Sequence, residues 1–112
     1  MKNVSVIEII GTPNAIIQAF GISVYNKILT FVNNNEEIEI DFNGISNVTS
    51  GFCHASIGKL YSDYPVYANS KITIKGLLDN PIALEKIQYA IDLASNPEKS
   101  KLNNDMISEL FN

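Results

Sequence analysis

The stretch that decides the fold is EIEIDFNGISNVTSGFCHASIGKL, residues 37–60. Acidic and apolar residues alternate up to Phe42, and this period of two predicts a strand with one buried face. A small polar loop follows at residues 44–51, and from Phe52 the apolar residues return at helical spacing until about Tyr64. The stretch therefore predicts a strand, a turn and a helix.

The sequence before this stretch predicts a further strand and helix. Residues 4–10, VSVIEII, are rich in β-branched residues and predict the strand. Thr12 and Pro13 place a capping hydroxyl before a proline at a first helical position, so we expect the helix to span residues 13–33. Its predicted apolar face recurs at steps of three and four: Ile16, Phe20, Val24, Ile28 and Phe31.

The sequence after it predicts the same pair of elements again. Residues 71–75, KITIK, alternate and predict a third strand. Asn80 and Pro81 repeat the pattern of a cap and a proline, which begins a helix that we expect to end near Asn96. The predicted apolar face of that helix consists of Ile82, Ile87, Ala90, Ile91 and Ala94.

The order strand, helix, strand, helix, strand, helix is typical of an α/β fold, with a mostly parallel or mixed sheet and helices packed on it. A chain of 112 residues has room for one core, so we expect a single small domain over residues 1–97. We expect residues 98–112 to be a polar C-terminal tail, with a short amphipathic helix at Met106–Phe111. Functional loops in such sheets follow the carboxyl ends of strands, as the 44–51 loop does.

Composition limits the function and the compartment. All eight basic residues are lysines and the net charge is -4, which disfavours nucleic-acid binding. A lone cysteine, Cys53, excludes an intramolecular disulfide and fits a reducing compartment. No run approaches the ~20 apolar residues of a membrane span, and the first residues do not resemble a signal peptide. We therefore expect a cytoplasmic protein with no membrane partner.

Few residues offer catalytic or ligand-binding chemistry. Ser50 lacks the first glycine of a nucleophile elbow, and His54 is poorly placed to be its base. Adjacent helical residues project about 100° apart, which disfavours a dyad of Cys53 and His54. A single histidine offers too few metal ligands, and no loop matches a phosphate-binding or dinucleotide motif. We expect no enzyme, cofactor or metal, with a small enzyme or ligand-binding protein using Cys53 and His54 as the alternative.

Thr49 and Ser50 stand where the helix after the loop begins. Either hydroxyl could cap the helix by accepting a backbone hydrogen bond. A kinase could also reach this turn, and backbone N–H groups would hold the added phosphate. Both interpretations can apply to the same residue.

The stretch IEIDFNGISNVTSGFCHASIGKL, residues 38–60, resembles the STAS domain (sulphate transporter and anti-sigma-factor antagonist). It resembles more closely the STAS-like family that often accompanies histidine-kinase-type ATPases in bacteria. In that family a strand ends in Asp-Phe, Gly-Val or Gly-Ile follows, and Ser-Phe opens the next helix. The matching positions are Asp41-Phe42, Gly44-Ile45 and Ser50-Gly51-Phe52. The aspartate that precedes the phosphorylated serine in STAS antagonists has no counterpart in Val48-Thr49-Ser50-Gly51.

The resemblance implies a non-catalytic regulatory module that binds a protein partner, a histidine-kinase-like ATPase, with phosphorylation at Thr49 or Ser50 as a switch. We expect the binding face to be the 43–54 loop and the exposed side of the following helix. The predicted partner-binding residues are Asn47, Gly51, His54, Ser56 and Lys59. A further alternative is a structural subunit that forms a homo-oligomer through the Met106–Phe111 segment.

Overall fold

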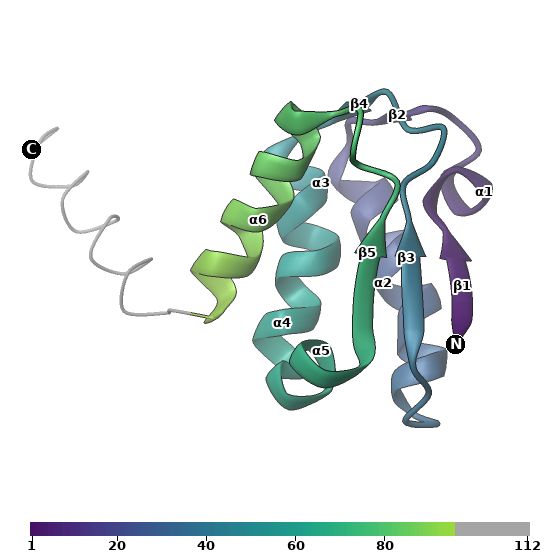
Figure 1. Cartoon of the computed structure of the whole chain (residues 1–112), viewed down its shortest axis with the longest axis vertical. Helices are drawn as coiled ribbons and strands as arrows, with labels where there is room; N and C mark the ends of the chain where they lie inside the picture. Colours follow the sequence, from purple (N-terminus) through teal and green to yellow (C-terminus); the bar gives the residue numbers. More distant parts are fainter. Residues whose placement is uncertain (96–112) are drawn as a thin grey trace, which may run out of the picture.

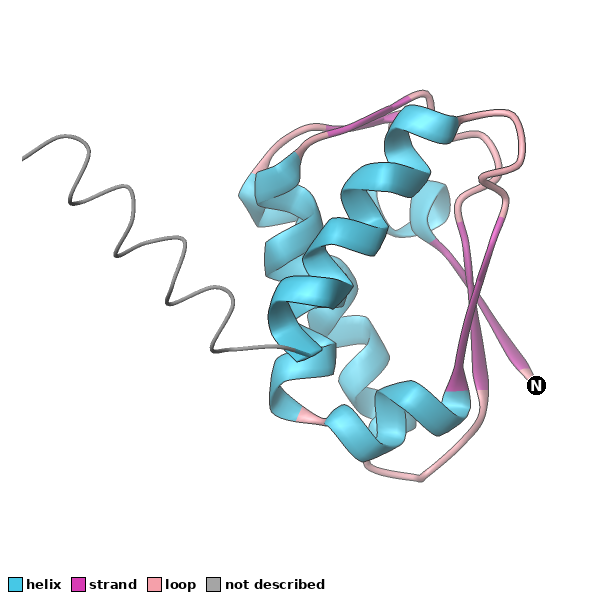
Figure 2. Cartoon of the chain, turned by 60° about the vertical axis from the view of Figure 1, so that its left-hand side comes forward, coloured by secondary structure: helices cyan, strands magenta, loops and turns pink. Residues whose placement is uncertain are grey.

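The computed structural model describes residues 1–95 and confirms the predicted α/β class. Three parallel strands form one sheet in the order β1-β3-β5, and the helices lie on one side of it (Figures 1 and 2). These strands are β1 (Lys2–Ser5), β3 (Ile38–Asp41) and β5 (Ile72–Lys75). The predicted helix at Met106–Phe111 lies outside the described residues.

The central strand has the predicted alternation. Ile38, Ile40 and the following Phe42 are buried, with exposed fractions of 0%, 0% and 1%. The opposite face of the sheet carries two polar rows, in which Asn3, Glu39 and Thr73 are in register, as are Ser5, Asp41 and Lys75. Lys75 Nζ lies 2.8 Å from Glu39 Oε1 and 3.8 Å from Asp41 Oδ2, so ion pairs link β5 to β3 on this face. A sheet with one solvated face is expected to alternate in this way.

The first strand, predicted over residues 4–10, is wrong from Val6 onward. β1 ends at Ser5, and the next residues form the short helix α1 (Val6–Ile10). Ser5 Oγ accepts a hydrogen bond from the backbone N–H of Glu8 at 3.4 Å. Gly11 ends the helix with a φ of 75°, a left-handed conformation that suits glycine. These caps and the burial of Val6 outweigh the strand preference of the β-branched residues.

The helix predicted to begin at Pro13 begins later. Thr12 Oγ1 accepts a hydrogen bond from the backbone N–H of Asn14 at 3.2 Å, so these residues form a turn rather than a helix cap. A short strand β2 (Asn14–Ala15) then pairs in parallel with β4 (Asn47–Val48) in a second sheet that the sequence did not predict. The helix itself, α2, spans Gln18–Val32.

The buried face of α2 is only partly the predicted one. Val24 and Ile28 are fully buried, as expected. The assignment of Ile16 to this face is wrong, because Ile16 precedes the helix and is 49% exposed. Gly21 and Tyr25 also belong to the buried face.

The helix predicted after the loop is confirmed, and we call it the central helix (residues 50–63). It consists of α3 (Ser50–Cys53), a π-helical turn η1 (His54–Gly58) and α4 (Lys59–Asp63), which follow one another without a break (Figure 1). A short helix that the sequence did not predict, α5 (Pro65–Lys71), leads from it into β5.

The last predicted helix is confirmed as α6 (Pro81–Ser95). Asn80 Oδ1 accepts a hydrogen bond from the backbone N–H of Ala83 at 3.2 Å, which is the expected cap. Ile87 and Ala90 are buried, but Ile82 is 67% exposed and does not belong to the buried face. Within residues 1–95, none of the helices combines the length and apolar character needed to cross a membrane.

Candidate protein-binding groove

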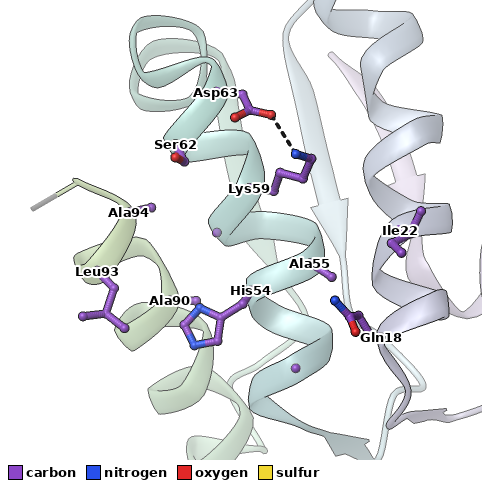
Figure 3. Close-up of a pocket in the computed structure, with 12 residues that line it drawn as sticks. Gln18, Ile22, His54, Ala55, Lys59, Ser62, Asp63, Ala90, Leu93 and Ala94 are labelled. Carbon is purple, nitrogen blue, oxygen red and sulfur yellow. Dashed lines mark ion pairs between the residues drawn. The ribbon is translucent and has the colours of Figure 1, made fainter. Parts of the chain in front are cut away.

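A groove of about 850 Å³ runs along the exposed side of the central helix, between α2 and α6 (Figure 3). The central helix forms its floor, and the other two helices form its walls. Its lining residues are Gln18 and Ile22 from α2, Gly51, His54, Ala55, Gly58, Lys59, Ser62 and Asp63 from the central helix, and Ala90, Leu93 and Ala94 from α6.

The floor is made mainly of small residues. Gly51, Ala55 and Gly58 follow one another at helical steps, so they lie along one side of the central helix. A Cβ added to Gly51 would meet no atom within 4 Å, so the floor is open there. Ile22 and Leu93 stand on the two walls, and Ile22 is 47% exposed. Ala55 and Gly58 are buried, because Ala55 packs against Gly21 of α2 and Gly58 lies close to Ala90 of α6. Another backbone can therefore approach closely at Gly51, while the walls offer apolar contact.

One end of the groove carries the charged residues Lys59 and Asp63, which are held by an ion pair and a hydrogen bond. Lys59 Nζ lies 3.3 Å from Asp63 Oδ2, and the Tyr25 hydroxyl donates a hydrogen bond of 2.6 Å to the same oxygen. The ammonium group of Lys59 also lies 5.2 Å from the centroid of the Tyr25 ring. The hydrogen bond from Tyr25 is the main cause that lowers the pKa of Asp63, with Lys59 adding to it. Burial is the main cause that raises the pKa of Tyr25 above its ordinary value. Asp63 is therefore charged at neutral pH and keeps Lys59 at the groove.

The side chain of His54 extends from the floor toward α6 (Figure 3). Its ring packs edge-to-face on Tyr89, with 6.4 Å between ring centroids. His54 is exposed, so the imidazole is available to a molecule that enters the groove.

The structure brings together three of the five predicted partner-binding residues. Gly51, His54 and Lys59 all line the groove. Asn47 is exposed on β4, outside the groove, and its Nδ2 donates to Asn14 Oδ1 at 2.7 Å. The placement of Ser56 on the exposed side of the helix is wrong, because Ser56 is fully buried. Its hydroxyl donates to the carbonyl oxygen of Phe52 at 2.7 Å.

The two hydroxyls of the turn differ in their surroundings. Thr49 Oγ1 accepts a hydrogen bond from the backbone N–H of Phe52 at 3.3 Å, so Thr49 caps the central helix. Thr49 is half-buried, whereas Ser50 is exposed in the first helical turn, next to Gly51 of the groove. Of the two, Ser50 is the hydroxyl that a modifying enzyme can reach.

The alternative interpretation, a small enzyme that uses Cys53 and His54, would need Cys53 as a reactive nucleophile. Cys53 is fully buried, and burial raises the pKa of its thiol to about 11. The thiol is therefore protonated at neutral pH, and His54 lies in the exposed groove instead of beside it. Among residues 1–95, no three histidine, cysteine, aspartate or glutamate side chains gather closely enough to hold a metal ion.

The walls of the groove were not predicted. Gln18 and Ile22 come from a helix more than 25 residues before the floor, and Leu93 comes from one about 30 residues after it. One signal was available: Ile22 lies off the face that Val24 and Ile28 define, and an exposed isoleucine beside a buried face can indicate a contact surface.

Residues 21–81 match the family described as STAS-like domain of unknown function (DUF4325). The match covers more than half of the chain, including the central strand, the turn and the central helix. With a parallel sheet, helices on one face and this match, the chain belongs to the STAS-like family. Neither the curated proteins nor the solved structures gave a match to the chain.

Proposed function

We propose that this protein is a non-catalytic regulatory module of the cytoplasm that binds a protein partner through the groove over its central helix. The observation that carries this proposal is the groove itself, with a floor of small residues, apolar walls and a charged end. Amphipathic helices bind other proteins in grooves of this kind. Lys59, which is half-exposed, would meet a carboxylate of the partner.

The partner class that we propose is a histidine-kinase-like ATPase. Support comes from the STAS-like family membership and from the resemblance of the 41–52 region to proteins that accompany such ATPases. Ser50 is the site at which phosphorylation would act, because it is exposed and adjoins Gly51 at one end of the groove. A phosphate there would add about two negative charges to the edge of the interface.

The groove can be tested with a substitution that fills it. Gly51→Leu places a side chain into open space, so it should leave the fold intact while it blocks the floor. Asn26→Leu is a matched control, because Asn26 is exposed on α2 and does not line the groove. Calorimetric titration would measure binding to histidine-kinase-like ATPases of the source organism, beginning with any encoded beside this protein.

We expect Gly51→Leu to weaken binding by about tenfold or more, equivalent to ~1.4 kcal/mol, and Asn26→Leu to bind as the wild type does. If none of these ATPases binds the wild type, the proposed partner class is wrong. If one binds and Gly51→Leu binds it equally well, the groove is not the binding site.

A further inference from the structure

We infer that the groove has an occupant within the same chain: the C-terminal segment, residues 98–112, folds back over the central helix when no partner is bound. Three observations support this inference. They are the position of the end of α6, the pattern of apolar residues after it, and the size and lining of the groove.

α6 ends at Ser95, next to one end of the groove. Its last turn carries Leu93 and Ala94, which line the groove beside Ser62 and Asp63 (Figure 3). Asn96 and Pro97 follow, and proline disfavours a helical conformation in the residue before it. A reversal of direction at this point would lead the chain back along the floor toward Gly51.

The segment has the pattern of a helix with one apolar side. Leu102, Met106 and Leu110 recur at steps of four, and Ile107 and Phe111 lie beside that row on a helical projection. The opposite side of the projection carries the polar residues Asn104, Asp105, Ser108 and Glu109, and Asn103 is the single polar residue on the apolar side. An apolar row of this kind needs a surface to cover it, either in the same chain or in another.

The groove has a matching length and lining. Its floor extends from Gly51 to Asp63, which is about 20 Å at 1.5 Å per residue. As a helix, residues 102–111 would be about 15 Å long and would fit within it. Gly51 is exposed and would admit the helix at one end of the floor. A reversed direction would bring Lys101 toward the other end, where Asp63 pairs with Lys59.

A covalent link favours this occupant over a separate molecule. A short linker gives an attached segment an effective concentration in the millimolar range, so even weak apolar contacts would fill the groove. One consequence rests on the proposed function: a partner would have to displace the segment, which would then act as an internal competitor.

The chain provides its own probe, because the single histidine in its sequence is His54, on the floor of the groove. NMR signals of the ring protons of His54 would be compared in three proteins that span residues 1–112. They are the wild type, the doubly substituted Met106→Asp/Leu110→Asp, and the control Asn104→Asp/Ser108→Asp. Both variants add two negative charges, but only the first places them in the apolar row.

We expect the His54 signals of the control to coincide with those of the wild type, and those of Met106→Asp/Leu110→Asp to shift by more than a line width. The shift should not depend on protein concentration. Identical His54 signals in all three proteins would overturn the inference. So would a shift that disappears on dilution, because the occupant would then be a second copy. No ATPase is present, so the result is independent of the proposed partner.

Discussion

Gly21 of α2 faces Ala55 of the central helix so closely that a Cβ on Gly21 would lie 2.8 Å from the Cβ of Ala55. The same Cβ would lie 2.6 Å from the carbonyl oxygen of Phe52. A backbone carbonyl in a helix cannot move aside as the end of a flexible side chain can. This contact therefore requires glycine, although glycine weakens a helix by about 1 kcal/mol relative to alanine.

The first prediction is that Gly21→Ala destabilises the protein by about 1–3 kcal/mol, because overpacking outweighs the gain in helix propensity. Urea unfolding would measure the change. Gly51→Ala is the matched control, since a Cβ there meets no atom within 4 Å, and it should be at least as stable as the wild type. Equal stability of Gly21→Ala and the wild type would mean that the two helices pack less closely than described.

A second prediction concerns the hydrogen bond between Tyr25 and Asp63. The pKa of Asp63 is lowered in the folded state, so its bonded carboxylate stabilises the protein at neutral pH, and this contribution is lost as the pH falls through the folded pKa. Tyr25→Phe removes the main cause and should cost about 1 kcal/mol at neutral pH.

The difference between the wild type and Tyr25→Phe should then narrow in acid, below about pH 4. Urea unfolding at a series of pH values would measure it. Asp63→Asn removes the carboxylate itself and should reduce the pH dependence in the same way. A difference that stays constant from neutral to acidic pH would show that the hydrogen bond does not depend on the charge of Asp63.

Third, the two hydroxyls of the turn should differ in their effect on stability. Thr49→Ala removes the cap of the central helix and should cost about 1 kcal/mol. Thr49→Asp should retain most of that stability, because a carboxylate can also cap a helix and favours its N-terminus. Ser50→Ala should change the free energy of unfolding by less than about 0.5 kcal/mol. Equal losses in the two alanine variants would contradict the assignment of Thr49 as the cap.

Fourth, Ser50→Asp should weaken binding of the proposed ATPase partner while the melting temperature stays near that of the wild type. The reason is that a charge at the groove edge must lose water when the interface closes. Ser50→Ala tests whether loss of the hydroxyl alone has this effect, and it should bind as the wild type does. Unchanged binding by Ser50→Asp would argue that Ser50 is not a switch.

Fifth, the thiol of Cys53 should react slowly with an alkylating reagent in the native protein at neutral pH. A pKa raised from 9.0 to about 11 reduces the thiolate fraction by about a hundredfold, and burial also restricts access of the reagent. Unfolding in urea should restore the ordinary rate. Rapid labelling of the native protein would instead support an enzyme that uses Cys53.

The parts of the fold that a single periodicity determines were predictable from the sequence. Glu37 to Phe42 alternate with a period of two, and such a pattern gives a strand whose apolar residues share one buried face. The cap at Asn80 was also predictable, because an amide side chain before a proline has a local effect on the backbone.

Other parts depended on signals that compete within a few residues. In VSVIEII the β-branched residues indicated a strand, yet Ser5 and Glu8 have the spacing of a capping box and Gly11 follows at the helix end. Those three residues indicate the helix α1, but the prediction gave more weight to the β-branched composition of the segment. The walls of the groove could not be predicted, because Ile22 and Leu93 come together with Gly58 only through tertiary packing.

The polar face of the sheet, opposite the helices, limits which side of the domain can be covered by another protein layer and which can carry a label. Lys75, Glu39, Asp41 and Asn3 would all have to give up water or their present bonds if another layer were laid over them. The domain therefore has a back that resists coverage, opposite the helices that form its front (Figure 2). A fluorophore or solid support coupled to the thiol of a Thr73→Cys variant would leave the groove free, because Thr73 is exposed on that back and the native Cys53 is buried.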